Sequence, residues 1–171
     1  ATLALQGGDR AVDSSTGSAT SDTLALGQVD YSLDFGFWAP QVSVGDYVWI
    51  DNDADGVQED GIDVPIAGVT LTITTAAGGA VKNVYGQSVT TTTTDANGLY
   101  TFAHLPLGQY KVTITYGDGY IATLEEVGSD TTVDSSTDSA TSANLTVDGA
   151  SDPTLDFGII GTVSVGDYVW F

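Results

Sequence analysis

An internal repeat limits how this chain can fold more than any other feature. The segment VSVGDYVW at Val42–Trp49 returns at Val163–Trp170, an offset of 121 residues. Other blocks recur in the same order between residues 1–50 and 122–171: ATL at 1 and 122, VDSSTGSAT at 12 against VDSSTDSAT at 133, and LDFG at 33 and 155. The offset is 121 residues for each block except LDFG, where it is 122. A shared order of blocks at a nearly constant spacing indicates tandem copies of one folding unit.

The repeat divides the chain into three expected parts. Residues 1–41 are interpreted as the C-terminal part of a preceding repeat, 42–162 as one complete domain, and 163–171 as the first strand of a following repeat. Such a chain is either a window on a longer array or a subunit whose ends are completed by neighbouring copies. In the second case, its last strand would add to a sheet of the next copy and propagate head to tail.

Short alternating segments within the complete repeat predict β-strands rather than helices. In AGVTLTITTA, for example, Val69, Leu71 and Ile73 share one face and the threonines share the other. We expect strands at 42–50, 67–76, 88–94, 99–105, 108–116, 142–147 and 154–160. About seven such strands, separated by Gly, Asn, Asp and Pro, predict an all-β fold, an antiparallel Ig-like or prealbumin-like β-sandwich.

The charge of the chain restricts its partners. It carries 23 acidic residues against three basic ones, a formal net charge of −20. Nucleic acids and anionic membrane surfaces both require a basic face, so we expect neither as a partner. There is also no apolar run long enough to predict membrane insertion. The chain has no cysteine, and a domain without disulfides can be stabilised by metal instead.

An acid-rich segment follows the first strand of the complete repeat. Residues 51–56 read D-x-D-x-D-G, with Asp51, Asp53 and Asp55 at loop positions 1, 3 and 5 and Gly56 at position 6. Ca²⁺ prefers six to eight hard oxygen ligands, and alternate side chains of a tight loop converge on one point. A glycine at position 6 permits the sharp turn. The pattern therefore predicts a calcium loop of the EF-hand type.

The rest of this loop departs from the EF-hand pattern. The carbonyl of Val57 takes position 7, and Glu59 at position 9 binds directly or through water. Ile62 stands at position 12, where an acid is usual, so we expect Asp63 to replace it. The flanking segments are strand-like, which predicts the loop without the helices. A solvated acidic turn is the alternative, but it leaves the crowding of like charges unexplained; Mg²⁺ is the rival ion.

The order of motifs resembles a known family. VGDYVWIDNDADGVQEDG, then AGVTLTI, then TTTDANGLYTFAHLPLGQYKVTITYGDGY is similar to the B-type, Cna-B-like repeat of the serine-aspartate-repeat adhesins. The resemblance covers residues 42–162 and the fragments on both sides. It implies a calcium-bound β-sandwich that serves as a stiff module of an extracellular, cell-surface protein.

Two other groups of polar residues are secondary metal candidates. Asp95 and Asn97 precede Gly98 in TDANGLY, where the alternative is a hairpin turn in which both side chains cap the backbone. The other group lies in and beside VDSSTDSAT, where the alternative is a soluble polar loop; its members are Asp118, Asp130, Asp134 and Asp138.

These observations favour a structural function over a catalytic one. His104 is the only histidine and has no cysteine or histidine partner for zinc, and no G-x-S-x-G motif is present. We expect a non-enzymatic repeat of a stalk, adhesin or filament, which binds Ca²⁺ and contacts neighbouring repeats or subunits head to tail. The alternative is an adhesin module that recognises a host protein or glycan through its Thr-rich strand and the loop around Tyr85.

Overall fold

The computed structural model describes residues 18–162, and the chain divides into two units, Ala1–Ala39 and Pro40–Phe171. The described part of the first unit, residues 18–39, is extended apart from a turn at Leu26 and Gly27. The expected first strand of a following repeat, residues 163–171, lies outside the described residues, as do residues 1–17 of the expected preceding repeat.

The second unit consists of short strands, and its described residues contain no helix. The strands are β1 (Val42–Val44), β2 (Val48–Ile50), β3 (Val64–Pro65), β4 (Thr70–Thr75), β5 (Val81–Lys82), β6 (Ser88–Val89), β7 (Thr91–Thr93), β8 (Phe102–Leu105), β9 (Tyr110–Thr115), β10 (Tyr120–Ala122), β11 (Ser139–Thr141), β12 (Ser151–Asp152) and β13 (Phe157–Gly161). Nothing in residues 18–162 is a helix that could cross a lipid bilayer.

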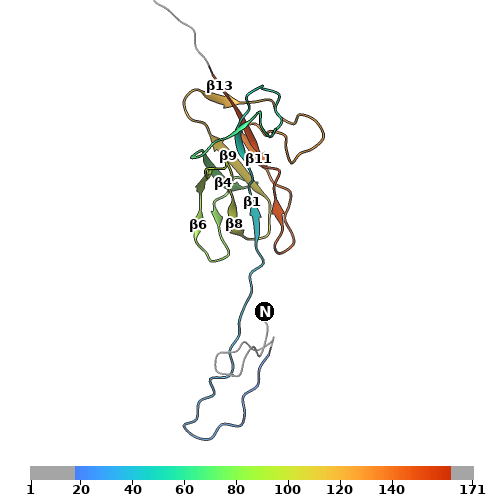
Figure 1. The fold of residues 1–171 in the computed structure, drawn as a ribbon. Helices are drawn as coiled ribbons and strands as arrows, with labels where there is room; N and C mark the ends of the chain where they lie inside the picture. Colours follow the sequence, from blue (N-terminus) through green and yellow to red (C-terminus); the bar gives the residue numbers. More distant parts are fainter. Residues whose placement is uncertain (1–17, 163–171) are drawn as a thin grey trace, which may run out of the picture. The chain divides into compact units, whose positions relative to one another are not determined.

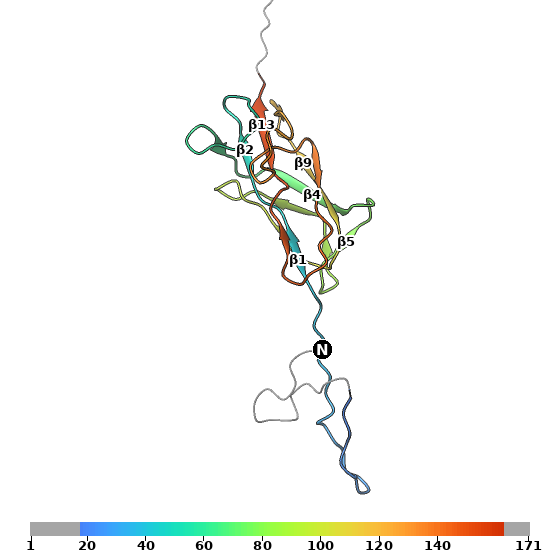
Figure 2. The same ribbon diagram turned by 90° about the vertical axis from the view of Figure 1, so that its right-hand side faces the viewer.

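The strands form a sandwich of two layers (Figures 1 and 2). One layer is the sheet β11-β9-β4-β7. The other combines the sheets β12-β1-β8 and β10-β13-β2-β3, because β1 continues into β2 and β12 into β13. Most pairs are antiparallel, as predicted, but β1 pairs with β12 and β2 with β13 in parallel. The predicted all-β sandwich is confirmed, with the first and last strands side by side.

The core lies between the two layers. The predicted inward face of β4 is correct, because Leu71 and Ile73 are buried while Thr70 and Thr72 lie on the outer face. Val112 of β9 and Val48 of β2 are both fully buried in this core. Burial of such side chains provides the main driving force for folding.

The expected strand at 42–50 is broken in the middle, because its two halves belong to different sheets. Gly45 joins them with φ of 149°, and a Cβ on this residue would lie 2.4 Å from the carbonyl oxygen of Tyr100. Only glycine permits this approach of two backbones. The break leaves Val48–Ile50 beside β13, directly before the acid-rich loop.

The expected strand at 142–147 is wrong. The structure places strands on either side of it, at β11 and β12, and Leu145 makes only an isolated bridge to Gly108. The reason is local, because the Ser142 hydroxyl accepts a hydrogen bond from the backbone N–H of Tyr110 (3.0 Å) and ends the β11–β9 ladder. Side-chain bonds of this kind compete with strand pairing.

Candidate metal centre

The acid-rich loop Asp51–Asp63 connects β2 to β3. These strands pair antiparallel, with Trp49 opposite Pro65 and Ile50 opposite Val64, so the two ends of the loop are brought together. The N–H of Asp51 donates to the carbonyl of Ile159 in β13 (2.9 Å). The loop therefore begins at the end of β2, where it is bonded to the last strand β13, and returns to the same sheet at β3.

Five of the predicted carboxylates gather within this loop. One oxygen each of Asp51, Asp53 and Asp63 lie within 4.8 Å of one another, and the same holds for Asp53, Asp55 and Glu59. Asp53 belongs to both groups and joins them. The described residues contain no other group of three His, Cys, Asp or Glu with this spacing.

Asp51 is the buried member of the group, with 3% of its surface exposed. Its Oδ1 accepts a hydrogen bond from the N–H of Ala54 (2.7 Å), and its Oδ2 accepts from the N–H of Gly56 (2.8 Å). The hydroxyl of Thr123 also donates to Oδ2 (2.5 Å). Burial raises the pKa of Asp51, but these hydrogen bonds outweigh it and hold the pKa below its usual value. Asp51 is thus an ionised carboxylate fixed in place.

Asp63 closes the loop from its far end. Its Oδ1 accepts from the N–H of Asn52 (3.1 Å) and its Oδ2 accepts from the N–H of Glu59 (2.9 Å). The side chain of Asn52 donates to the carbonyl of Ile62 (2.6 Å). These bonds keep Asp63, rather than the exposed Ile62, beside Asp51 and Asp53.

Gly56 turns the loop sharply and brings it close to another segment. Its φ is 84°, in the left-handed region that favours glycine. A Cβ here would lie 2.7 Å from the carbonyl oxygen of Leu124 and 2.8 Å from a methyl group of Val127. The predicted role of Gly56 in the turn is therefore accompanied by a packing role.

The middle of the loop forms a short bridge to the VDSSTDSAT segment. The N–H of Gln58 donates to the carbonyl of Val133 (2.7 Å), and the N–H of Ser135 donates to the carbonyl of Gly56 (3.1 Å). Val57 lies opposite Asp134, and its N–H donates to Oδ1 of Asp55 (2.8 Å). The Val57 carbonyl takes part in none of the hydrogen bonds among residues 18–162, so it is available as a ligand.

Repulsion among the carboxylates contributes to raised pKa values of Asp53 and Glu59. Loss of contact with water and the neighbouring charge of Asp55 raise the pKa of Asp53. The same two causes raise the pKa of Glu59, with further contributions from Asp53 and Asp63. A bound cation would remove this repulsion. Two groups of carboxylates that share Asp53 offer hard oxygen atoms, the kind of ligand that Ca²⁺ takes.

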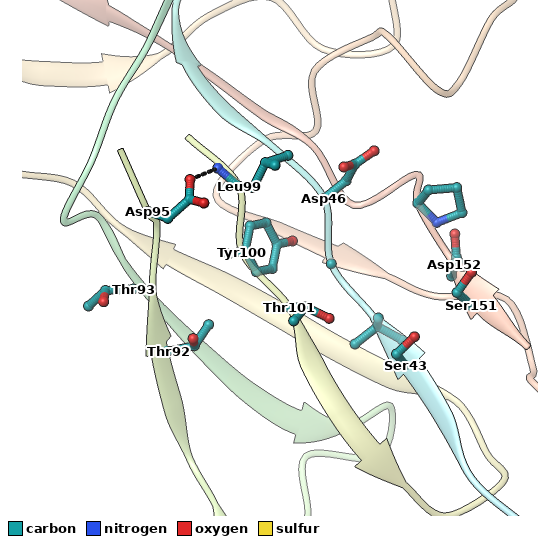
Figure 3. Close-up of a pocket in the computed structure, with 13 residues that line it drawn as sticks. Ser43, Asp46, Thr92, Thr93, Asp95, Leu99, Tyr100, Thr101, Ser151 and Asp152 are labelled. Atoms are coloured by element: carbon teal, nitrogen blue, oxygen red, sulfur yellow. Dashed lines mark hydrogen bonds between the residues drawn. The ribbon is translucent and has the colours of Figure 1, made fainter. Parts of the chain in front are cut away.

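Asp95 and Asn97 lie in a tight turn between β7 and β8. Oδ1 of Asp95 accepts hydrogen bonds from the N–H of Asn97 (2.8 Å) and of Leu99 (3.0 Å), the second drawn in Figure 3. The N–H of Gly98 donates to the Asp95 carbonyl (3.1 Å). Asp95 also borders a hollow of about 570 Å³, in which Asp46 and Asp152 stand on different segments of the chain (Figure 3).

The remaining candidates are separated from one another, and all but Asp134 lie at the surface. Oδ1 of Asp130 accepts from the N–H (3.1 Å) and hydroxyl (2.6 Å) of Thr132, and Oδ1 of Asp138 accepts from the hydroxyl of Tyr116 (2.8 Å). Asp118 is exposed in the turn before β10. Asp134 is buried, and burial together with the charges of Glu126 and Asp130 raises its pKa.

No sequence motif predicted the roles of two other buried polar residues, Thr123 and Asp156. Thr123 fixes Asp51, although it lies 72 residues further along the chain. Asp156 of the LDFG motif is fully buried, and its Oδ1 accepts from the N–H of Tyr47 (3.1 Å). Its Oδ2 has no hydrogen-bond partner among the described residues. Burial, with a contribution from Asp46, raises the pKa of Asp156 to about 8.

The fold and the acidic loop between β2 and β3 can be compared with known repeat domains. The SdrD B-like domain family model matches residues 42–159. The chain is 38% identical over 167 residues to serine-aspartate repeat-containing protein F of Staphylococcus epidermidis, covering 96% of this chain and 9% of that protein. It is 35% identical over 171 residues to serine-aspartate repeat-containing protein D of Staphylococcus aureus strain Newman, covering 99% of this chain and 12% of that protein.

This chain therefore belongs to the SdrD B-like domain family, which confirms the resemblance and the cell-surface location expected with it. It spans about a tenth of the length of these relatives. Among solved structures, the minor pilin GBS52 of Streptococcus agalactiae is similar, with a TM-score of 0.43, 16% identity, and coverage of 82% of this chain and 55% of that one. The major pilin subunit BcpA of Bacillus cereus has a TM-score of 0.40 and 14% identity, covering 73% and 31%.

Proposed function

We propose that residues 42–162 form one calcium-stiffened repeat of an extracellular stalk, adhesin or filament, with a structural rather than a catalytic role. Asp51, Asp53, Asp55, Glu59, Asp63 and the carbonyl of Val57 are the proposed ligands of Ca²⁺. The bound ion supplies positive charge among crowded carboxylates and so couples folding of the loop to metal binding.

The observation that carries this proposal is the position of the loop between two parts of the domain. Its ends belong to β2 and β3, and its centre is bonded to Val133 and Ser135. Ordering the loop therefore orders the long segment between β10 and β11, which has little secondary structure of its own. A cation that organises both segments stiffens one end of the sandwich.

The proposed tandem arrangement is supported by matching the two LDFG motifs. Leu155, Phe157 and Ile159 are at most 1% exposed, because they are covered by the rest of their repeat. The corresponding Leu33, Phe35 and Phe37 are 37%, 48% and 86% exposed. Residues 1–41 are therefore proposed to be the end of a repeat whose remaining strands would cover these side chains.

The pairing of the first and last strands within residues 42–162 also bears on strand donation between copies. Within residues 42–162 the place beside β12 and β13 is already taken by β1 and β2 of the same chain. This domain does not need a donated strand, so we favour covalent linkage of tandem repeats. If a strand is donated by another copy, we expect it to pair with residues 29–37, whose partner strands are not supplied by residues 42–162. Deletion of Val163–Phe171 tests donation: if head-to-tail assemblies of the chain persist without this segment, donation by it is excluded.

The calcium proposal is tested by thermal unfolding of the full chain with Ca²⁺, with Mg²⁺ and with excess chelator. We expect Ca²⁺ to raise Tm sharply and Mg²⁺ to raise it less, since binding to the folded state alone stabilises it by mass action. The double variant Asp53→Asn, Asp55→Asn should lose the response. The matched control Asp118→Asn, Asp138→Asn alters acids outside the loop and should retain it. An identical Tm with calcium and with chelator would refute the proposal.

The second candidate is recognition of a ligand by the outer face of the β11-β9-β4-β7 sheet. Pairing places Thr93, Thr70 and Thr115 in one row across three strands and Thr91, Thr72 and Thr113 in the next. Electron microscopy of native material separates the two functions, because regular rods favour the structural one and isolated domains on a partner favour recognition.

A further inference from the structure

A rigid turn between β5 and β6 presents an exposed tyrosine. The N–H of Asn83 donates to the Gln87 carbonyl and the N–H of Gly86 donates to the Asn83 carbonyl, both at 2.9 Å. Oδ1 of Asn83 accepts from the N–H groups of Tyr85 and Gln87, both at 3.0 Å. The turn therefore holds Tyr85 in one place although 67% of its surface is exposed.

His104 supports Tyr85 from the neighbouring strand β8. The two ring centroids lie 5.5 Å apart with the planes tilted by 55°, and the N–H of Val84 donates to the His104 carbonyl (2.8 Å). His104 has φ of 57°, a conformation that residues other than glycine rarely adopt, above all within a strand. Strained backbone of this kind persists where the surroundings impose it, often at binding sites.

Two glutamine side chains are held by hydrogen bonds in this region, one bonded to His104 and one within the turn that carries Tyr85. Oε1 of Gln41 bonds to Nδ1 of His104 (2.8 Å), and Oε1 of Gln87 accepts from Nδ2 of Asn83 (3.0 Å). Both side chains thus have their oxygen engaged. Neither Nε2 group takes part in a hydrogen bond among residues 18–162, so both remain available as donors to a ligand.

The surface formed by Tyr85, His104, Gln41 and Gln87 adjoins a hollow and contains no acidic side chain. Gln41 and His104 border a hollow of about 180 Å³ between β1, β8 and the Gly149–Ala150 segment, roughly the volume of six waters in the liquid. Charged residues of both signs adjoin this surface: Lys82 directly precedes the turn, and Asp148 accepts a hydrogen bond from the N–H of Gln41 (2.9 Å). None of Tyr85, His104, Gln41 and Gln87 is acidic, in a chain of net charge −20.

We propose that Tyr85, His104, Gln41 and Gln87 form a binding site for a neutral pyranose sugar. The apolar C–H face of a sugar ring packs on an exposed aromatic ring whose own edge is polar. The two amide NH₂ groups donate to sugar hydroxyl oxygens, and the hollow beside His104 accommodates a ring substituent or a second residue of the glycan. A neutral ligand requires no counter-charge, so binding should be insensitive to salt.

The test is a titration of the ¹⁵N-labelled full chain with methyl β-D-glucopyranoside and, separately, methyl β-D-galactopyranoside, followed by NMR. We expect saturable shifts of the amide signals of Val84–Gln87 and His104 with at least one sugar, and a Kd of about 1 mM, as is usual for so small a ligand. Methyl β-D-glucuronide, which is anionic, should bind more weakly to this acidic chain.

Two variants and a control locate the site. Tyr85→Ala should raise Kd at least about tenfold, with the remaining amide spectrum unchanged. His104→Gly accepts φ of 57° without strain, so it should preserve Tm while raising Kd several-fold. Tyr31→Ala removes another tyrosine, 73% exposed, and should leave Kd unchanged.

Three results would overturn the proposal. These are the absence of saturable shifts with both neutral sugars, shifts that map away from the Val84–Gln87 turn, and equal affinity in the Tyr85→Ala variant. Stronger binding of the glucuronide than of the neutral sugars would contradict the argument from charge. None of these outcomes depends on the calcium loop. A failure of the proposed sugar site would therefore leave the proposed structural function untouched, and the reverse also holds.

Discussion

The hydroxyl of Thr123 donates a 2.5 Å hydrogen bond to Oδ2 of Asp51, and both side chains are buried. Thr123 follows β10, and its own N–H donates to the carbonyl of Gly158 in β13 (3.1 Å). The first carboxylate of the loop is therefore oriented by a residue that belongs to the sheet. Groups that orient metal ligands in this way influence affinity although they do not touch the ion.

Thr123→Val should weaken calcium binding about 10- to 100-fold. It should also destabilise the calcium-free domain by about 1.5–3 kcal/mol, because a buried carboxylate loses a donor. Isothermal titration calorimetry and chemical unfolding measure the two effects. Thr94→Val is the matched control, since Thr94 is equally buried and donates to the Ile66 carbonyl (2.6 Å) away from the loop. Equal loss of calcium affinity in both variants would show that the Thr123–Asp51 hydrogen bond has no specific effect on calcium binding.

Gly56→Ala should be far more harmful than Gly61→Ala. The two glycines lie in the same loop with nearly equal φ, 84° and 83°. A Cβ on Gly61 meets no atom within 4 Å, so that variant should lose only about 1–2 kcal/mol from backbone strain. A Cβ on Gly56 meets the Leu124 carbonyl and Val127, which adds about 1–3 kcal/mol of overpacking.

The comparison of these glycine variants is made by chemical unfolding in the presence of calcium. Both variants lose stability through backbone strain at a positive φ. The difference between their free energies of unfolding therefore measures the contact of Gly56 with the 124–127 segment. If Gly61→Ala proves as destabilising as Gly56→Ala, the close approach at Gly56 contributes nothing measurable.

Asp156→Asn should stabilise the domain at high pH. The folded-state pKa of Asp156, about 8, is raised by burial above the usual value of 3.8. Its contribution to stability is therefore fully present below about pH 4 and is lost as pH rises through about 8, by up to about 1.4 kcal/mol per pH unit. The amide keeps an oxygen that can accept from the N–H of Tyr47 but does not ionise.

Melting temperatures of both proteins between pH 4 and pH 9, measured in chelator, check this expectation. The advantage of Asp156→Asn should grow with pH up to about 8 and then level off. At the acidic end the variant should be no more stable than the parent, because its NH₂ group has the same buried surroundings as the protonated Oδ2. Parallel curves across the range would show that Asp156 ionises normally.

The sequence predicted those features of the centre that depend on local spacing. The D-x-D-x-D-G pattern located the acid-rich loop and its glycine turn. Asp63 lies close to Asp51 and Asp53, and its role as the closing ligand in place of Ile62 stays a prediction. The alternation in β4 and β9 predicted the inner face of one sheet. In each case a few adjacent residues decide the outcome, so a linear pattern is enough.

Features that depend on distant parts of the chain could not be read in this way. The bond from Thr123 to Asp51 joins segments separated by 72 residues, and Thr123 stands in no motif. The break at Gly45 is imposed by the carbonyl of Tyr100, which arrives from β8's side of the sandwich. The burial of Asp156 follows from the parallel pairing of β13 with β2, which brings Asp156 to the backbone N–H of Tyr47, whereas its sequence neighbours indicate only an ordinary strand.

The parallel pairing of β1 with β12 and of β2 with β13 has a mechanical consequence. The chain enters the domain at Val42 and leaves after Gly161, at opposite ends of these paired strands (Figure 1). Tension applied along the polypeptide would slide the first strands against the last ones, loading all of their hydrogen bonds at the same time instead of unzipping them singly. We expect such shear geometry to make this domain more resistant to pulling forces than a domain whose terminal strands unzip.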